Sequence, residues 1–504
     1  MSLPRFPESY WLSSADIPAF EPLKASIDVE VAVIGGGITG ITTAYLLAKE
    51  GKRTALLTSG SLIGGTTGYT TAKITVQHNL IYDEHIRHFG LEKAGLFYQA
   101  NNEALAFIRK KVEEYGIDCD FTEEDAFVYA TTDVGEELLR KEVAAYRELN
   151  IPGYLTDDLP LPFPVRSALG LRGQARFHPV PYLVRLVTEF VRMGGQVYED
   201  TMVEAVEEGS PNRLKIGGGI EAVCDDVVSC SHFPVLESGL YFARLHAESS
   251  YVLAARLPHG QELPAGMYIS ADNPTRSIRT VTYKGEKLLL LGGESHKTGQ
   301  GVCTIKHYEA LEGWANSVFG VTDFPYRWST NDFVTLDKLP YIGQATGRHP
   351  HSFVATGYRK WGMTSGTAAA LLLTDLIVGR DNRYRELFDP VRFQADPDLK
   401  ELIVQNADVA KQMIAGKLEW LTRKPDELGR DEGALVRIGG RKAGAYRDAE
   451  GELFLVDSTC THLGCEVEWN NGDRTWDCPC HGSRFHYDGG VLEGPATEPL
   501  KRIE

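Results

Sequence analysis

A run of alternating and then continuous apolar residues begins near residue 29. Residues 29–34, Val-Glu-Val-Ala-Val-Ile, predict a buried parallel strand, because such strands are covered on both faces. A glycine-rich turn follows, the residues from Ile41 to Glu50 predict a helix, and those from Arg53 to Thr58 predict a second strand. This order predicts a strand–turn–helix–strand unit of an α/β sheet.

The turn has the spacing G-x-G-x-x-G. Gly35 permits the tight turn, Gly37 lets the backbone approach a pyrophosphate, and Gly40 lets the helix pack on the strand. At the end of the second strand, where this motif usually has an acidic residue for the ribose, the chain has Thr58 followed by Ser59. Their hydroxyls could still hydrogen-bond the ribose, although without a charged acceptor. The alternative is that Thr58 only ends the strand. We predict a dinucleotide site in which the turn contributes Gly35, Gly36, Gly37, Ile38, Thr39 and Gly40.

A Gly/Thr-rich loop from Gly64 to Lys73 resembles the flavin-wrapping loop of the D-amino-acid oxidase and glycine oxidase family. Asp337-x-x-Pro-x-x-Gly343 and the glycine-rich loop 355–366, which precedes a predicted helix, resemble later motifs of this family. The resemblance spans about residues 25–390 and implies non-covalent FAD. The alternative for residues 64–73 is a solvated surface loop, and the alternative for Val203 is an apolar strand residue with no ligand contact. The further FAD contacts that it implies are Thr66, Thr67, Thr71, Ala72, Val203, Gly343, Gly357, Gly362, Met363 and Thr364.

Between these motifs the patterns predict a second layer of structure. Residues 80–150 predict helices with charged faces, which would cap the flavin. Strand-like patterns at 250–257 and 280–293 predict a sheet of a substrate domain. Gly217 to Ala222 also fits G-x-G-x-x-A, but no helix follows it, so we predict a β-hairpin turn and no second site for NAD(P)H.

Two boxes near the end of the chain, Cys460-Thr-His-Leu-Gly-Cys465 and Cys478-Pro-Cys-His-Gly-Ser483, offer two thiolates and two imidazoles. This set suits a [2Fe–2S] cluster with Cys460 and Cys478 on one iron and His462 and His481 on the other. Zinc in a Cys₂His₂ site is the alternative, although C-x-H is tight for zinc. The second pair, Cys465 and Cys480, lies one in each box and could close a disulfide between the two boxes.

The boxes resemble the Rieske proteins of cytochrome bc complexes over the last eighty residues, including Gly494-Pro-Ala496, which is similar to the loop that covers the cluster. The resemblance implies that Ser483 donates a hydrogen bond to a bridging sulfide. Phe485 stands where high-potential members often have Tyr. We therefore expect a potential below the top of the Rieske range of about −150 to +300 mV.

The predicted fold is an α/β Rossmann-like FAD domain with an interleaved α+β substrate domain, mostly antiparallel, and a small all-β Rieske domain. The boundaries that the patterns and resemblances suggest are 1–90, 170–240 and 330–395 for the FAD domain, 91–169 and 241–329 for the substrate domain, 396–424 for a helical connector, and 425–504 for the Rieske domain.

Composition excludes some partners. The net charge of −17 and the lack of a basic run argue against nucleic acid as a partner. The sequence has no window of eighteen uninterrupted apolar residues, so we predict no membrane span. The start of the chain has no signal-peptide pattern, so we expect a cytoplasmic protein. We expect the four cysteines outside the boxes to be reduced. A disulfide within the boxes would be unusual in a reducing cytosol, although burial beside a cluster could protect it.

A flavin takes two electrons as a hydride and a Rieske cluster carries one, so the pair suggests a converter. We predict a dehydrogenase that oxidises a small amine or amino acid, an expectation that rests on the resemblance, and passes single electrons to the cluster and an external acceptor, such as a redox protein. The alternatives are an electron-transfer component between partner proteins and a structural or redox-sensing cluster. Candidates to contact substrate, each also explicable as a structural residue, are Lys73, His78, Tyr251, His296 and Arg359.

Overall fold

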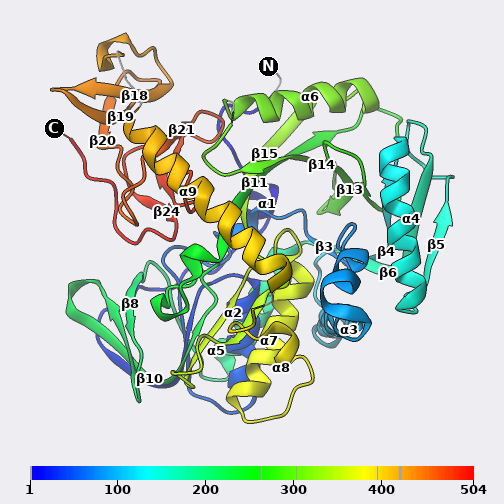
Figure 1. The fold of residues 1–504 in the computed structure, drawn as a ribbon, viewed down its shortest axis with the longest axis horizontal. Coiled ribbons are helices and arrows are strands. Elements are labelled where there is room, and N and C mark those ends of the chain that lie inside the picture. Colours follow the sequence, from blue (N-terminus) through cyan, green and yellow to red (C-terminus); the bar gives the residue numbers. More distant parts are fainter. Residues whose placement is uncertain (1–2, 263, 302, 394, 419–422, 504) are drawn as a thin grey trace.

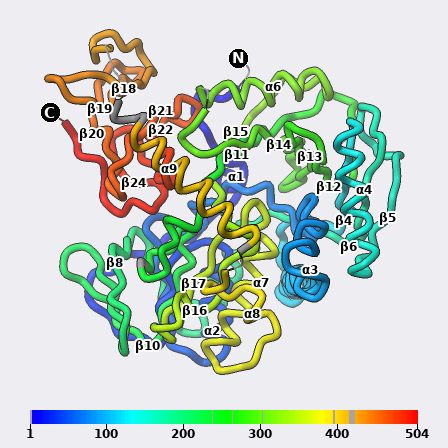
Figure 2. The backbone as a smooth tube through the Cα atoms, viewed as in Figure 1, coloured from blue at the N-terminus to red at the C-terminus, as the bar shows by residue number. Residues whose placement is uncertain are grey.

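The computed structural model of the chain describes residues 3–262, 264–301, 303–393, 395–418 and 423–503. They form two large sheets with their helices and a smaller C-terminal β domain, and Figures 1 and 2 show this domain against one end of the larger body. No helix of these residues is long and apolar enough to cross a membrane.

The first large sheet is built on the predicted strand–turn–helix unit. Its central strand, β1 (Ile27–Ile34), pairs in parallel with β10 (Ile220–Ser229) and β2 (Thr54–Leu57), as expected for strands buried on both faces. The remaining strands are β7 (Gln196–Tyr198), β17 (Ser352–Thr356), β16 (Tyr341–Gln344), β8 (Val203–Glu207) and β9 (Asn212–Ile216). The helices packed with it are α2 (Ile38–Lys49), α5 (Pro179–Arg192) and α7 (Gly362–Ile377).

The second glycine motif is a hairpin turn, as predicted. β9 and β10 pair antiparallel with Ile216 opposite Ile220, and a short turn, Gly217–Gly219, joins them. A strand follows the motif where a nucleotide site needs a helix, so its glycines cannot receive a pyrophosphate on a helix N-terminus.

The second large sheet has nine strands and is mostly antiparallel, in agreement with the expected substrate domain. Its strands are β15 (Asp323–Thr335), β11 (Leu245–Arg256), β14 (Glu286–Lys297), β13 (Arg276–Tyr283), β12 (Met267–Ser270), β4 (Thr122–Ala130), β6 (Ser167–Arg176), β3 (Lys73–Ile74) and β5 (Gly153–Thr156). The helices packed on it are α4 (Asp133–Glu148) and α6 (Ile305–Phe319), and α3 (Tyr82–Tyr115) packs against α4 and α7. The structure also contains two short helices, α1 (Tyr10–Ser14) and α8 (Arg385–Phe388).

The prediction that residues 80–150 are helical is wrong for one segment. β4 lies between α3 and α4, pairs antiparallel with β6 and parallel with β12, and buries its second half. Its first half carries Thr122-Glu-Glu-Asp125, and long-range pairing overrides that polar start. The expected boundary at residue 170 also falls inside β6, which belongs wholly to the nine-stranded sheet.

The C-terminal domain consists of two small antiparallel sheets, so the all-β expectation is confirmed. One contains β18 (Glu432–Ile438), β19 (Arg441–Arg447) and β20 (Leu453–Asp457), and the other β21 (Glu468–Asn470), β22 (Thr475–Asp477), β23 (Arg484–His486) and β24 (Val491–Glu493). The connector is helix α9 (Lys400–Leu418), which Figure 1 shows crossing from the larger body to this domain. Part of the expected connector 396–424, residues 419–422, lies outside the described residues.

Candidate functional site

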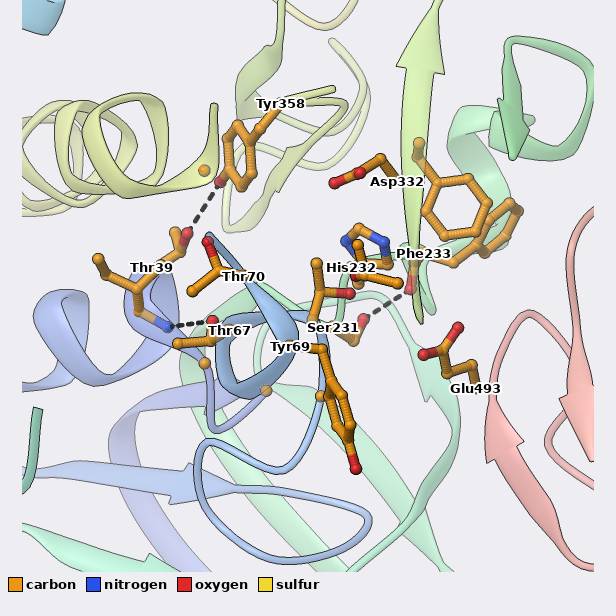
Figure 3. A pocket seen from close by; sticks show the side chains of 18 of the residues that line it. Thr39, Thr67, Tyr69, Thr70, Ser231, His232, Phe233, Asp332, Tyr358 and Glu493 are labelled. Carbon is orange, nitrogen blue, oxygen red and sulfur yellow. Dashed lines mark hydrogen bonds between the residues drawn. The ribbon is translucent and has the colours of Figure 1, made fainter. Parts of the chain in front are cut away.

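A cavity of about 520 Å³ lies where three parts of the molecule meet (Figure 3). One wall consists of the segments that follow the carboxyl ends of β1, β2 and β10, where ligands of open α/β sheets bind. The opposite wall is a face of the nine-stranded sheet. The segment from Val491 to Thr497 of the C-terminal domain, which consists of β24 and the residues after it, forms a third side. The cavity is therefore lined by residues of the eight-stranded sheet, the nine-stranded sheet and the C-terminal domain together.

The dinucleotide turn has the geometry that its sequence predicts. Gly35 has φ +115°, a conformation that residues with a side chain rarely adopt, and a Cβ there would collide with the carbonyl of Cys230. A Cβ at Gly40 would overlap the carbonyl oxygen of Gly35. The backbone N–H of Ile38, in the first turn of α2, donates a hydrogen bond to Thr67 Oγ1 at 3.1 Å. The backbone can therefore come close to a pyrophosphate at the start of α2.

The structure brings most of the predicted FAD contacts to this cavity. Those that line it are Gly35, Gly36, Gly37, Ile38, Thr39, Thr58, Ser59, Thr66, Thr67, Thr71, Val203, Gly362 and Met363. Those that do not line it are Gly40, Ala72, Gly343, Gly357 and Thr364. Gly343 and Gly357 instead allow close packing against Pro390 and Thr335. These five residues shape the backbone around the cavity and do not form its surface.

The segment Ser231-His232-Phe233 also lines the cavity and was not predicted. It directly follows β10, at the carboxyl edge of the parallel sheet, and that position is the signal that could have found it. Asp332 and Glu493 line the cavity as well, but they lie in strands with no motif of their own. Figure 3 shows the side chains of these residues around the cavity.

Three of the five candidates for substrate contact line the cavity: Lys73, Tyr251 and Arg359. Lys73 Nζ donates hydrogen bonds to the carbonyl of Tyr268 at 2.9 Å and to Ser277 Oγ at 2.7 Å. Burial, and secondarily the positive charge of Arg279, lowers the pKa of Lys73 to about 7. Lys73 is therefore poised near neutrality between an amine and an ammonium group.

The two candidate histidines do not line the cavity. His78 is buried, stacks on Trp361 with ring centroids 4.8 Å apart, and its Nε2 lies 3.0 Å from Thr364 Oγ1. Burial lowers the pKa of His78 to about 3, so the ring is neutral. His296 lies behind Tyr251, with its Nε2 2.9 Å from the Tyr251 hydroxyl. Both histidines support residues of the cavity wall.

The two C-terminal boxes come together as predicted. Cys465 and Cys480 form a disulfide with Cα atoms 6.5 Å apart, and the sulfur of Cys478 lies within 4.8 Å of both disulfide sulfurs. Cys460 and Cys478 remain free and buried. The two thiols left by the disulfide are therefore the two that the spacing assigns to one iron.

The rings of His462 and His481 lie side by side, with centroids 4.9 Å apart and planes at 89°. The Nδ1 atom of each ring is buried and has no hydrogen-bond partner among the described residues. Burial lowers the pKa of both histidines to about 4, so each ring is neutral with a free lone pair. Unpartnered buried nitrogens of this kind are what a metal would satisfy, so the donor set fits a [2Fe–2S] cluster.

Ser483 lies beside the same thiols. Its Oγ accepts a hydrogen bond from the backbone N–H of Ala496 at 3.0 Å, and its hydroxyl also hydrogen-bonds Cys460. Ser483 thus joins the covering loop to the donor set. Phe485 is fully buried and brings no hydroxyl to it.

The C-terminal domain presents its histidine pair to the larger body. The ring of His462 lies 6.1 Å from that of Phe233, a cavity residue, and the ring of His481 lies 6.2 Å from that of Phe242. Around them, Asn331 Nδ2 donates to Glu493 Oε2 at 3.0 Å. Elsewhere in the interface, the Tyr308 hydroxyl donates to Asp473 Oδ1 at 2.8 Å and Gln300 Nε2 donates to the carbonyl of Pro479 at 3.2 Å.

A dinucleotide cavity that an iron–sulfur-type domain closes defines a two-cofactor oxidoreductase. Residues 30–376 match the family described as FAD dependent oxidoreductase (DAO), and residues 420–504 match the Rieske [2Fe-2S] domain. The chain belongs to this FAD-dependent oxidoreductase family and carries a C-terminal Rieske domain. FAD and a [2Fe–2S] cluster are therefore its cofactors.

Individual relatives agree with both assignments. The chain is 46% identical over 499 residues to YhfW of Bacillus subtilis (strain 168), named as a candidate Rieske 2Fe-2S iron-sulfur protein, over 99% of this chain and 98% of the relative. A segment of 52 residues, 10% of this chain, is 58% identical to cytochrome b6-f complex iron-sulfur subunit 1 of Synechocystis sp. and covers 29% of that protein. The fold is similar to glycine oxidase from Geobacillus kaustophilus, with TM-score 0.62 and 21% identity, over 73% of this chain and 100% of that one.

Proposed function

We propose that the chain oxidises a small amine or amino acid at FAD and passes the electrons singly through the Rieske cluster to an external acceptor. The observation that carries this proposal is the position of Phe233, which lines the FAD cavity and also contacts the ring of His462. The bound FAD supplies a two-electron acceptor and the cluster a one-electron carrier. A shared residue between their sites supports direct exchange between them.

The residues of the chain have distinct tasks in this function. The turn from Gly35 to Gly37 and the start of α2 hold the pyrophosphate through backbone N–H groups. Gly362 and Met363 begin α7, whose N-terminal N–H groups and dipole favour negative charge at the flavin. The segment from Val491 to Thr497, which begins with β24, lines one side of the cavity.

The interface between the two domains is polar and well partnered. Arg484, buried beside the cluster boxes, lies 2.9 Å from Asp473 and 3.3 Å from Asp477. Asp473 also accepts from Tyr308 of the nine-stranded sheet's helix α6. The Arg484 pairs lie within the Rieske domain, so the contact that helps to hold this domain against the larger body is the hydrogen bond from Tyr308 to Asp473. A fixed position keeps the distance between the cofactors constant.

The test is anaerobic light-driven reduction of the flavin, followed by visible and EPR spectroscopy. We expect the flavin bands to bleach and the signal of the reduced cluster to grow with them. The control is Cys460→Ser, which removes a cluster ligand and should leave the flavin as the final electron carrier. A flavin that stays reduced beside an oxidised wild-type cluster contradicts direct exchange.

Substrate oxidation needs a second arm of the same experiment. We expect anaerobic addition of amines or amino acids to bleach the flavin without light. Bleaching by a reduced partner protein alone, with none by small molecules, would favour the electron-transfer component over the dehydrogenase.

A further inference from the structure

Asp332 is a buried carboxylate that faces the FAD cavity and has no partner among the residues that the structure describes. It lies in β15, is 6% exposed and lines the cavity, as Figure 3 shows. Thr330, two residues earlier on the same strand face, lines the cavity too. Among the described residues, no donor lies within hydrogen-bonding distance of the Asp332 carboxylate and no cation within ion-pairing distance.

The neighbouring carboxylates differ from Asp332 in this respect. Glu493 accepts from Asn331 Nδ2 at 3.0 Å and lies 3.8 Å from Arg484. Glu248, the residue opposite Asp332 on β11, lies 3.6 Å from His246 and 4.0 Å from Lys360. Both have partners within the protein, so Asp332 alone is left for a ligand.

Two cations act on Asp332, Lys360 and Arg359, and neither forms an ion pair with it among the described residues. Lys360, the strongest opposite charge that acts on Asp332, donates to Ser295 Oγ and lies beside Glu248. Burial raises the pKa of Asp332 to about 7, because a charged carboxylate is disfavoured away from bulk solvent. A cationic ligand in the cavity would satisfy this carboxylate.

We infer that Asp332 binds the ammonium group of a cationic amine substrate on the wall of the FAD cavity. This inference rests on the proposed function and assigns the residue that would hold the substrate's ammonium group, which amines and amino acids both carry at neutral pH. An ammonium group would donate a charge-assisted hydrogen bond to the carboxylate, which is the strong kind in a water-poor site. Asp332 thereby positions the amine within the same cavity as the flavin.

The test uses the FAD-loaded, cluster-loaded protein and two probes of equal length, n-butylammonium and butyrate. Anaerobic titration of the flavin absorption spectrum reports binding of each probe, as a band shift or as bleaching. We expect n-butylammonium to bind the wild-type protein and Asp332→Asn to weaken that binding by about 10- to 100-fold. Butyrate should bind no more weakly to Asp332→Asn than to the wild type.

Glu248→Gln is the matched control, because it removes the same charge from the opposite residue of the next strand, outside the cavity lining. It should leave n-butylammonium binding within about twofold of the wild type, since its charge is paired. Asp332→Glu keeps the charge and should retain binding, which separates lost charge from a disturbed fold, with FAD content and the cluster EPR signal as checks.

Equal n-butylammonium binding by wild type and Asp332→Asn overturns the inference, as does a wild-type protein that binds butyrate but not n-butylammonium. Light-driven electron transfer from flavin to cluster involves no substrate and should be the same in Asp332→Asn and wild type. Failure of the binding test with intact electron transfer therefore removes the assigned ligand class and leaves the proposed electron path standing.

Discussion

The contact between Gly299 and the second cluster box offers a direct test of whether close docking of the Rieske domain supports electron exchange. Gly299 follows β14 and has φ +68°. A Cβ at Gly299 would lie 2.7 Å from the backbone nitrogen of Pro479 and 2.8 Å from its Cα, and neither backbone atom can rotate away. Restoring a contact of 3.4 Å requires the two segments to separate by about 0.7 Å.

We predict that Gly299→Ala slows reduction of the cluster after light-driven reduction of the flavin. The overlap corresponds to about 1–3 kcal/mol of overpacking, or about a 5- to 150-fold change in the equilibrium between the docked and separated interface. The alanine also adopts a left-handed conformation at a cost of about 1–2 kcal/mol. Rapid-mixing and freeze-quench EPR would follow the cluster signal while absorption follows the flavin.

Gly301→Ala is the matched control. Gly301 lies in the same loop with φ +99°, and a Cβ there meets no atom within 4 Å in the described part of the chain. This variant carries the backbone cost without the overlap and should transfer electrons at the wild-type rate. Equal cluster reduction rates in the two variants, with unchanged cluster EPR line shapes, would refute the reasoning that close docking sets the rate.

Three further predictions concern the cluster and the fold. Ser483→Ala removes the hydrogen bond to Cys460, and such bonds stabilise the reduced cluster, which is the more negative form. A redox titration should therefore show a lower midpoint potential, by about 60 mV for each 1.4 kcal/mol of hydrogen-bond energy lost. An unchanged midpoint potential would exclude this role for Ser483. Replacing Cys465 and Cys480 by serine removes a crosslink across 15 residues, whose contribution to stability is about 3 kcal/mol. Iron should therefore be lost faster during incubation with a chelator. Equal iron retention in the variant and the wild type would argue against the disulfide as a stabiliser. Burial raises the pKa of Glu142 to about 7, although its carboxylate caps the first turn of α3, so protonation of Glu142 favours the folded state. Relative to Glu142→Gln, the wild-type free energy of unfolding should therefore fall by about 1.4 kcal/mol per pH unit from pH 5 to 7 and stay level above pH 7. A constant difference between the two proteins from pH 5 to 7 would contradict the raised pKa.

Some elements of this protein were predictable because their geometry depends on neighbours in the sequence. The turn from Gly35 to Gly40 requires glycine for local backbone reasons, and the hairpin at Gly217 to Gly219 follows from the strands on either side. Metal-ligand spacing in the two cysteine–histidine boxes is likewise a short-range property, and the family match agrees with it. β4 was missed because its polar first half is held by pairing with distant strands.

The sequence by itself determined the two cofactors, the glycine turn predicted to receive the dinucleotide, and the two boxes that supply thiols and imidazoles. Tertiary structure alone decided that Phe233 meets His462, that the segment from Val491 lines the same cavity as the glycine turn, and that Asp332 faces this cavity with no partner among the described residues. The physical reason is the range of the interactions. Motif spacing fixes backbone geometry over a few residues, whereas burial and strand pairing join segments hundreds of residues apart, and no local pattern records which side chains they leave facing a shared cavity.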